Sequence, residues 1–279
     1  MSNEQRENVS GRISILAIET TGPYASVALA TGGYDGQFVM GELRSDGKLT
    51  HLTSLTPMIK VLLDEEGLAL ADVSALAVSA GPGSFTGIRI GVSTARALAQ
   101  ALGIGIIKVP TLETFVYQCG AQAIVCPVFD ARRSQIYAGA YMRNEDEVIE
   151  TLVKGDAWDP EEFMDALGQS MDKGKAGGKI TFDHGITFCG DGAHLIEGLI
   201  ESPVGNAGVH FTIAESPEMV QSAASALKWA LYHGKFSRYW EVEPIYMRKA
   251  EAQRKLEEKQ ALEGVAGDRP DGETGSLSR

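Results

Sequence analysis

The chain has 279 residues, 44% hydrophobic and 22% charged, a composition typical of globular proteins rather than disordered or fibrous ones. Its formal net charge is −12, of which the terminal segments 1–12 and 250–279 carry only −2. An acidic body repels phosphate backbones, so we expect no unaided binding of nucleic acid.

Cysteine usage and the lack of long apolar runs predict a cytoplasmic protein. Cys119, Cys126 and Cys189 are an odd number without C-x-x-C spacing, which argues against a disulfide framework. No apolar run approaches the about 20 residues that a membrane helix needs. The polar start has no apolar stretch of a secretory signal. We therefore expect no membrane contact.

The first predicted half covers residues 12–110, after a loose tail at 1–11. Apolar runs and helical spacing predict its elements. They are strands at 13–20, 25–30 and 38–43, a helix at 50–65 bent by Pro57, a strand at 73–79, a glycine loop at 81–87 that opens a helix through Leu102, and a strand at 104–109. The turn at 21–24 makes the first two strands a hairpin.

The second half, 111–215, repeats this outline in degenerate form. Its expected elements are strands at 123–129, 136–141, 148–153 and 186–189, helices at 160–167 and 194–200, and a flexible basic insertion at 171–179. A helix at 216–232 is expected to pack back on the first half, and 250–279 to be disordered. The sequence therefore predicts two packed α/β units with a cleft between them.

The glycine loop allows two interpretations. Gly83 and Ser84 lie at a strand-to-helix junction, where backbone N–H groups can hold an anion. The loop is not a P-loop, because no lysine follows Gly87, and Gly83 before Ser84 excludes a nucleophile elbow. The alternative is a tight turn in which Ser84 caps the helix.

Two acids end corresponding strands of the two halves, Glu19 in the first and Asp130 in the second. If both strands are central in their sheets, the acids face one cleft, where a nucleotide–metal complex could sit. The candidate cleft residues are Glu19, Gly83, Ser84, Asp130, Arg132, Gly190 and Asp191. The alternative for each acid is a turn former at a strand end.

We predict no metal site and no catalytic residue in this chain. None of the five histidines lies four residues from another, so the helical histidine pair of many metal sites is absent. His51 stands alone at the start of its helix. No Ser/His/Asp or Cys/His arrangement is apparent.

Two helix faces could meet another chain or pack internally. Leu55, Ile59 and Leu62 form an apolar row on the first helix, and Gly91 and Ala95 lie on a face of small residues on the second. Small residues let another backbone approach closely.

The ordered motifs resemble one family. The strings I-L-A-I-E-T-T, S-A-G-P-G-S-F-T-G-I-R-I-G, F-D-A-R-R-S-Q-I-Y, C-G-D-G-A and P-I-Y-M-R occur in this order over about residues 13–250. The chain is thereby similar to the bacterial tRNA threonylcarbamoyladenosine biosynthesis protein TsaB (YeaZ) family. The resemblance implies the actin-like/Hsp70/sugar-kinase (ASKHA) architecture of two RNase H-like halves.

The resemblance also implies a non-catalytic subunit of the complex that makes threonylcarbamoyladenosine at position 37 of tRNA (t6A37). Its expected partners are a TsaD-type catalytic subunit and a TsaE-type ATPase, with tRNA met only indirectly and ATP and Mg²⁺ only in the complex. The expected contact with TsaD, or with a second copy in its absence, involves His51, Leu52, Leu55, Met58, Ile59, Leu62, Arg89, Gly91 and Ala95. The alternative is a stand-alone ATP-dependent phosphotransferase or metal-dependent hydrolase acting in the Glu19/Asp130 cleft.

Overall fold

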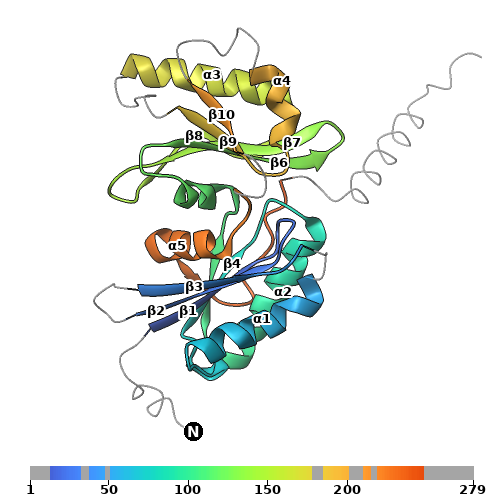
Figure 1. Cartoon of the computed structure of the whole chain (residues 1–279), viewed down its shortest axis with the longest axis vertical. Coiled ribbons are helices and arrows are strands. Elements are labelled where there is room, and N and C mark those ends of the chain that lie inside the picture. The colour runs from blue at the N-terminus through green and yellow to red at the C-terminus, as the bar shows by residue number, and fades with distance from the viewer. Residues whose placement is uncertain are drawn as a thin grey trace, which may run out of the picture. The chain divides into compact units, whose positions relative to one another are not determined.

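A computed structural model of the chain describes residues 13–32, 38–47, 51–177, 185–200, 210–214 and 219–247. The predicted tails at 1–11 and 250–279 lie outside this range. The chain as far as Ile245 forms one compact unit, which is built on two β-sheets with helices (Figure 1). The predicted two-sheet α/β architecture is therefore confirmed.

The first sheet has the strand order β11-β5-β4-β1-β2-β3. Its strands are β1 (Ile13–Glu19), β2 (Ser26–Gly32), β3 (Phe38–Arg44), β4 (Ala75–Ser79), β5 (Gly105–Val109) and β11 (Phe236–Ser237). The first three form an antiparallel meander, whereas β4 pairs parallel with β1 and with β5. β1, β2 and β4 are almost wholly buried, as expected of strands covered on both faces.

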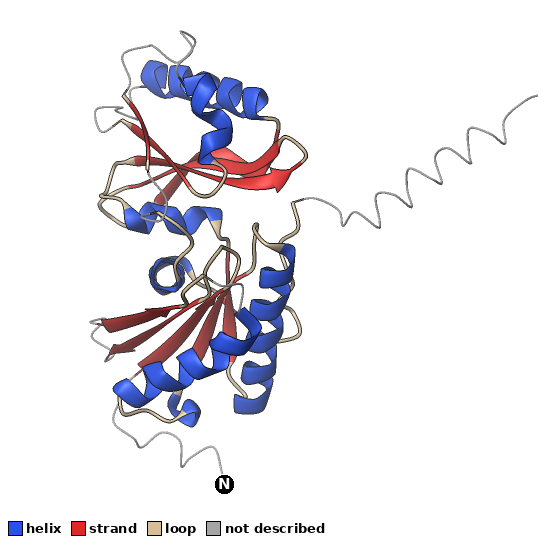
Figure 2. Ribbon diagram, turned by 45° about the vertical axis from the view of Figure 1, so that its right-hand side comes forward, coloured by secondary structure: helices blue, strands red, loops and turns tan. Residues whose placement is uncertain are grey.

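Helices cover both faces of this sheet (Figure 2). α1 (His51–Glu65) and α2 (Phe85–Leu102) pack with Leu16 and Ile18 of β1, while α5 (Ala223–His233) packs with Ile15 and Ala17. Since neighbouring residues of a strand point to opposite faces, α5 lies on the face opposite to α1 and α2. Pro57 lies inside a continuous α1 rather than ending it.

The second sheet repeats the topology of the first, with the order β10-β9-β6-β7-β8. Its strands are β6 (Ile124–Arg132), β7 (Gln135–Arg143), β8 (Ile149–Trp158), β9 (Ile186–Cys189) and β10 (Phe211–Ile213). β6, β7 and β8 are antiparallel, and β9 pairs parallel with β6 and β10. The two sheets with their helices are called the first and second lobe below.

The helix on the second sheet is longer than the sequence predicts. α3 spans Pro160–Gly177 rather than ending at Leu167, so residues 171–177 of the expected insertion are helical. The reason is packing, because Phe163, Leu167 and Met171 are spaced four apart and are all buried in the second core. Residues 178 and 179 lie outside the described residues. The predicted helix at 194–200 is a 3₁₀ turn, η4 (Ala193–Ile196), followed by α4 (Glu197–Ile200).

A 3₁₀ segment that the sequence did not predict, η3 (Leu112–Gln118), lies between the two sheets. It contacts α5 in the first lobe and β6, β7 and β8 in the second. The ring of Phe115 lies 5.5 Å from that of Phe129, and the Tyr117 hydroxyl lies 2.8 Å from Nε2 of His233. Hydrophobic and hydrogen-bonded contacts through η3 therefore join the lobes.

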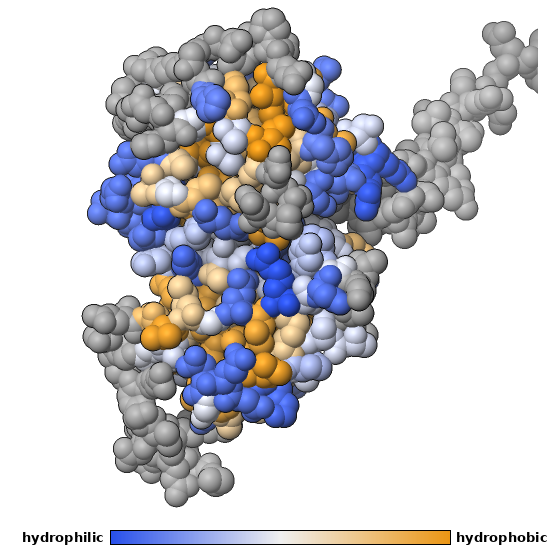
Figure 3. Space-filling view, in the orientation of Figure 1, coloured by the Kyte–Doolittle hydropathy of each residue, from blue (hydrophilic) through white to orange (hydrophobic). Residues whose placement is uncertain are grey.

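Other differences are local. The helix predicted at 216–232 begins at Ala223, because the hydroxyl of Ser222 caps it by accepting from the backbone amide of Ser225. The short elements η2 (Leu70–Asp72), β10 and β11 were not predicted. No helix among the described residues is long and apolar enough to cross a bilayer. In the face shown by Figure 3, hydrophobic residues reach the surface at several places among hydrophilic ones.

Candidate functional site: the α2 junction and the outer helix faces

The glycine loop before α2 is closed around the turn that follows β1. The backbone amide of Ser84 donates a hydrogen bond of 2.7 Å to the carbonyl oxygen of Thr21. A Cβ on Gly83, where φ is +148°, would lie only 2.5 Å from that oxygen. The Ser84 hydroxyl accepts a 3.2 Å hydrogen bond from the Gly87 amide and caps α2. Of the two interpretations of the glycine loop, anion binding and a tight turn, this geometry is the tight turn that caps α2.

The first turns of α2 lie directly against Thr20. The Thr20 hydroxyl donates a hydrogen bond of 2.7 Å to the carbonyl oxygen of Gly87. A Cβ on Gly87 would overlap the Thr20 carbonyl oxygen, and one on Gly91 would overlap the Thr20 hydroxyl. The two glycines thus serve a close internal contact between α2 and the turn after β1.

Glu19, at the end of β1, is fully buried rather than open to a cleft. Its Oε1 accepts a hydrogen bond from the backbone amide of Thr21. Its Oε2 has no hydrogen-bond partner of normal geometry, and neither have the nearby hydroxyls of Thr21 and Ser79. Ser79 comes to this place because β4 runs parallel to β1, with Val78 paired to Ile18. Burial raises the pKa of Glu19 above its usual 4.5, and the Ser79 hydroxyl partly offsets the rise.

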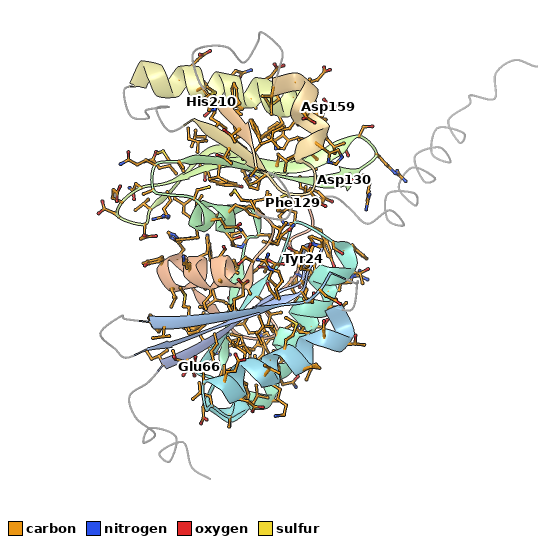
Figure 4. The ribbon with its side chains drawn as sticks, viewed as in Figure 1. Tyr24, Glu66, Phe129, Asp130, Asp159 and His210 are labelled. Atoms are coloured by element: carbon orange, nitrogen blue, oxygen red, sulfur yellow. The ribbon has the colours of Figure 1, made fainter. Side chains whose placement is uncertain are left out.

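The remaining predicted cleft residues, Asp130, Arg132, Gly190 and Asp191, belong to the second lobe, where Asp130 lies near the end of β6 (Figure 4). Asp130 accepts hydrogen bonds from the Arg132 backbone amide at 2.6 Å and from its guanidinium at 2.9 Å. A Cβ on Gly190 would lie 2.5 Å from the Val128 carbonyl oxygen, so the loop after β9 packs on β6. Asp191 is exposed as a residue, yet its carboxyl lies close to β6. Desolvation there, and less strongly the Asp130 carboxylate, raise its pKa.

The predicted contact row on α1 faces the sheet. Leu55, Ile59 and Leu62 are between 1% and 5% exposed and belong to the first core, as does Ala95 of α2. Gly91 is buried as well. This corrects the expectation that these five residues are free to meet a partner. An amphipathic helix on a sheet buries its apolar stripe, and that stripe is what the spacing detected. The side chains of His51 and Leu52 lie outside the described residues.

The outward side of the two helices carries two of the predicted contact residues, Met58 and Arg89, and two that were not predicted, Val61 and Phe85. Val61 of α1 is 47% exposed and Phe85 of α2 is 44% exposed. The exposed Arg89 lies one turn after Phe85, with its guanidinium 3.9 Å from the centroid of the Phe85 ring. Met58 is partly buried against the core. We call Met58, Val61, Phe85 and Arg89 the outer helix face.

Sequence reasoning overlooked three hydroxyl-bearing residues and one aromatic residue at this junction. Thr20, Thr21 and Ser79 surround Glu19, and Phe85 begins α2. A signal existed for the threonines, since a polar pair directly after a buried strand marks the end of that strand. No group of three or more histidine, cysteine or acidic side chains in the described part of the chain is arranged to hold a metal ion.

Comparison with known proteins agrees with the motifs. The family model described as "TsaD: tRNA N6-adenosine threonylcarbamoyltransferase" matches residues 46–256. The chain is 29% identical to the tRNA threonylcarbamoyladenosine biosynthesis protein TsaB of Bacillus subtilis over 252 residues, covering 89% of this chain and all of that protein. It is 34% identical to Escherichia coli TsaB over 139 residues, covering 48% of this chain and 57% of that protein.

Among solved structures, the chain is similar to YeaZ from Pseudomonas aeruginosa. The TM-score is 0.62 at 25% sequence identity, covering 84% of this chain and 99% of that one. The similarity thus includes both lobes.

Proposed function

This chain belongs to the TsaD family and, within it, to the TsaB (YeaZ) proteins, and from this premise we propose that it is the non-catalytic subunit of a t6A37-synthesising complex. Membership gives the chain a role in tRNA threonylcarbamoyladenosine biosynthesis. The proposal adds that it binds a TsaD-type catalytic subunit and works with a TsaE-type ATPase, and that ATP and Mg²⁺ act in the complex rather than on this chain alone.

The outer helix face is the observation that carries the proposal. α1 and α2 lie against each other on one face of the first sheet, and they present Val61, Phe85 and Arg89 to solvent. Exposed apolar side chains with a stacked arginine are the composition of interface anchors. The net charge of −12 favours a basic partner surface.

The closed junction at α2 supports a subunit rather than a nucleotide-using enzyme. The places where a phosphate would approach Gly83 and Gly87 are filled by Thr21 and Thr20 of the chain itself. Glu19, the acid expected to face a metal–nucleotide complex, is enclosed and has a raised pKa.

Mixing with a TsaD-type protein from the same source tests the proposal. We expect size-exclusion chromatography with light scattering to show a stable complex of this chain with TsaD. Val61→Glu should weaken it at least tenfold, because an unpaired charge desolvated in an interface costs several kcal/mol, and about 1.4 kcal/mol is a factor of ten. Leu55 and Ile59 are unsuitable test positions, because charges there would disrupt the core.

Val148→Glu provides the matched control. Val148 is 52% exposed and lies between β7 and β8 in the second lobe, so the same substitution is made on a surface outside the proposed contact. It should bind TsaD as the unaltered chain does. Equal binding by both variants and the unaltered chain would show that the outer helix face is not the contact. If no complex forms at all, the proposed TsaD partner is wrong.

One arrangement favours the alternative of a stand-alone phosphotransferase or metal-dependent hydrolase. Asp130, Arg132 and Asp191 bring two carboxylates and a guanidinium together at the end of β6. Isothermal titration of the isolated chain with Mg-ATP distinguishes the functions. Binding that Asp130→Asn abolishes would support the alternative, and no heat of binding would argue against the phosphotransferase.

A further inference from the structure

We propose that Glu19 is a positioning residue, an uncharged buried clamp that holds the turn after β1 and, through this turn, the first turn of α2. The residue is fully buried at the end of β1 and touches no solvent. The effect of this clamp on partner binding rests on the proposed function, because the first turn of α2 carries Phe85 and Arg89 of the outer helix face.

The clamp is a continuous chain of contacts. The Glu19 Oε1 accepts from the Thr21 amide, and the Thr21 carbonyl oxygen accepts from the amide of Ser84, the residue that caps α2. In parallel, Thr20 donates to the Gly87 carbonyl oxygen at 2.7 Å. The carboxyl therefore holds Thr21, whose carbonyl oxygen accepts from the amide at the start of the helix, and the preceding Thr20 adds a second link to α2.

The surroundings favour the protonated carboxyl. An ionised carboxylate in a dry interior needs hydrogen-bond donors or a cation on both oxygens, and Oε2 has none of normal geometry among the described residues. The hydroxyls of Ser79 from β4 and of Thr21 lie near the carboxyl. As donors they lower the pKa of Glu19 by less than burial raises it, and either hydroxyl oxygen can instead accept from a protonated Oε2. Among the described residues, the charged side chain that acts on Glu19 is Glu42 from β3, and its negative charge opposes ionisation.

The described parts of the neighbouring elements bring no compensating charge. Ser26, opposite Glu19 on β2, accepts a hydrogen bond from the Ala223 amide of α5. Glu42 itself accepts from the Ser222 hydroxyl at 2.9 Å. From α2, Gly87 and Gly91 lie against the neighbouring Thr20 and carry no side chain. A neutral acid thus satisfies this site better than a carboxylate does.

A pH series on the isolated chain tests the uncharged state. Unfolding by urea is compared for the unaltered chain and Glu19→Gln, which keeps an acceptor and a donor but cannot ionise. In the unfolded chain Glu19 ionises near 4.5, while the folded chain keeps the proton. Between about pH 5 and the raised pKa of the folded chain, the unfolding constant of the unaltered chain should therefore rise with pH relative to that of the variant, by up to tenfold per pH unit. A ratio independent of pH would show an ionised Glu19 and overturn the proposal.

Hydrogen exchange tests the positioning. Glu19→Leu keeps the volume but removes the acceptor for the Thr21 amide, so the amides of Thr21, Ser84 and Gly87 should exchange at least tenfold faster than in Glu19→Gln. Equal exchange in both variants would overturn the clamp. If Glu19→Leu does not fold, the pH series still decides whether the acid is neutral, and exchange at Ser84 in Glu19→Ser replaces the second comparison.

Binding to TsaD then separates the clamp from the proposed function. Glu19→Gln should bind as the unaltered chain does, and Glu19→Leu at least fivefold more weakly. If Glu19→Leu exchanges faster as expected but neither the unaltered chain nor Glu19→Gln binds TsaD, the clamp is supported and the proposed partner is wrong. If Glu19→Leu exchanges fast yet binds fully, the link from the clamp to the outer helix face is wrong.

Discussion

The hydroxyl of Thr20 donates a 2.7 Å hydrogen bond to the carbonyl oxygen of Gly87, which joins the turn after β1 to the first turn of α2. Both residues are buried. This bond explains why glycine stands at 87, where a side chain would overlap the Thr20 carbonyl oxygen. The glycine-rich motif of this chain is therefore a packing device.

Substituting alanine for Gly91 should destabilise the chain by about 1–3 kcal/mol, the usual cost of overpacking a core. The new methyl group would displace the Thr20 hydroxyl and weaken its bond to Gly87. The matched control is Gly168→Ala in α3, where nothing lies within 4 Å of the new Cβ. It should stabilise by about 0.5–1 kcal/mol through helix propensity. Urea unfolding measures both, and equal effects would contradict the close contact.

The two serine caps should differ in their contributions to stability. Ser84→Ala removes one capping bond at α2 and should cost about 1 kcal/mol. Ser222→Ala removes the cap of α5 and also the hydrogen bond to Glu42, so about 2–3 kcal/mol is expected. Thermal and urea unfolding compare the variants. A larger loss at Ser84 than at Ser222 would contradict this order.

Acidification should destabilise the junction of the lobes through His233. Burial lowers the pKa of His233 below its usual 6.5, and nearby Glu147 offsets this only partly. The unfolded chain therefore takes up a proton at a higher pH than the folded chain, and stability falls as pH drops through about 6.5 towards the folded pKa. His233→Gln keeps a polar partner for Tyr117 and should lose less stability between pH 7.5 and 5.5. Identical losses in the two proteins would exclude His233 as the cause.

Binding to a TsaD-type partner should weaken with salt. The chain carries a net charge of −12, and attraction to a basic surface is screened over about 10 Å at 0.1 M ionic strength. We expect the association rate to fall at least tenfold between 0.05 and 0.5 M NaCl, measured by surface plasmon resonance. Dissociation should change much less. An association rate unaffected by salt would contradict charge attraction between this chain and its partner.

Much of the fold could be predicted from local patterns. The apolar runs at β1 and β6, each followed by a turn and a returning strand, indicated two equivalent halves, and the sheets have that shared topology. The end of α2 at Gly103 also follows from local chemistry, because φ is +69° there, a left-handed conformation that favours glycine. η3 was missed because its compact apolar stretch has neither strand alternation nor a full helical stripe.

The candidate site could be predicted only in part, because spacing identifies an apolar row without saying what covers it. The row at Leu55, Ile59 and Leu62 was detected, but the sheet beneath α1 covers it, and Val61 on the other side is left exposed. Phe85 and Arg89 meet through stacking at 3.9 Å, a contact that their separation of one helical turn permits but does not require.

The sequence by itself determined the two-half α/β plan, the glycine-rich start of α2 and the acidic charge, because these depend on residue type and local periodicity. Only the tertiary structure decided that Glu19 is enclosed. Parallel pairing of β1 with β4 places Ser79 beside Glu19, although 60 residues separate them in the chain. Burial, and with it the charge state of an acid, depends on such distant neighbours, which local sequence does not encode.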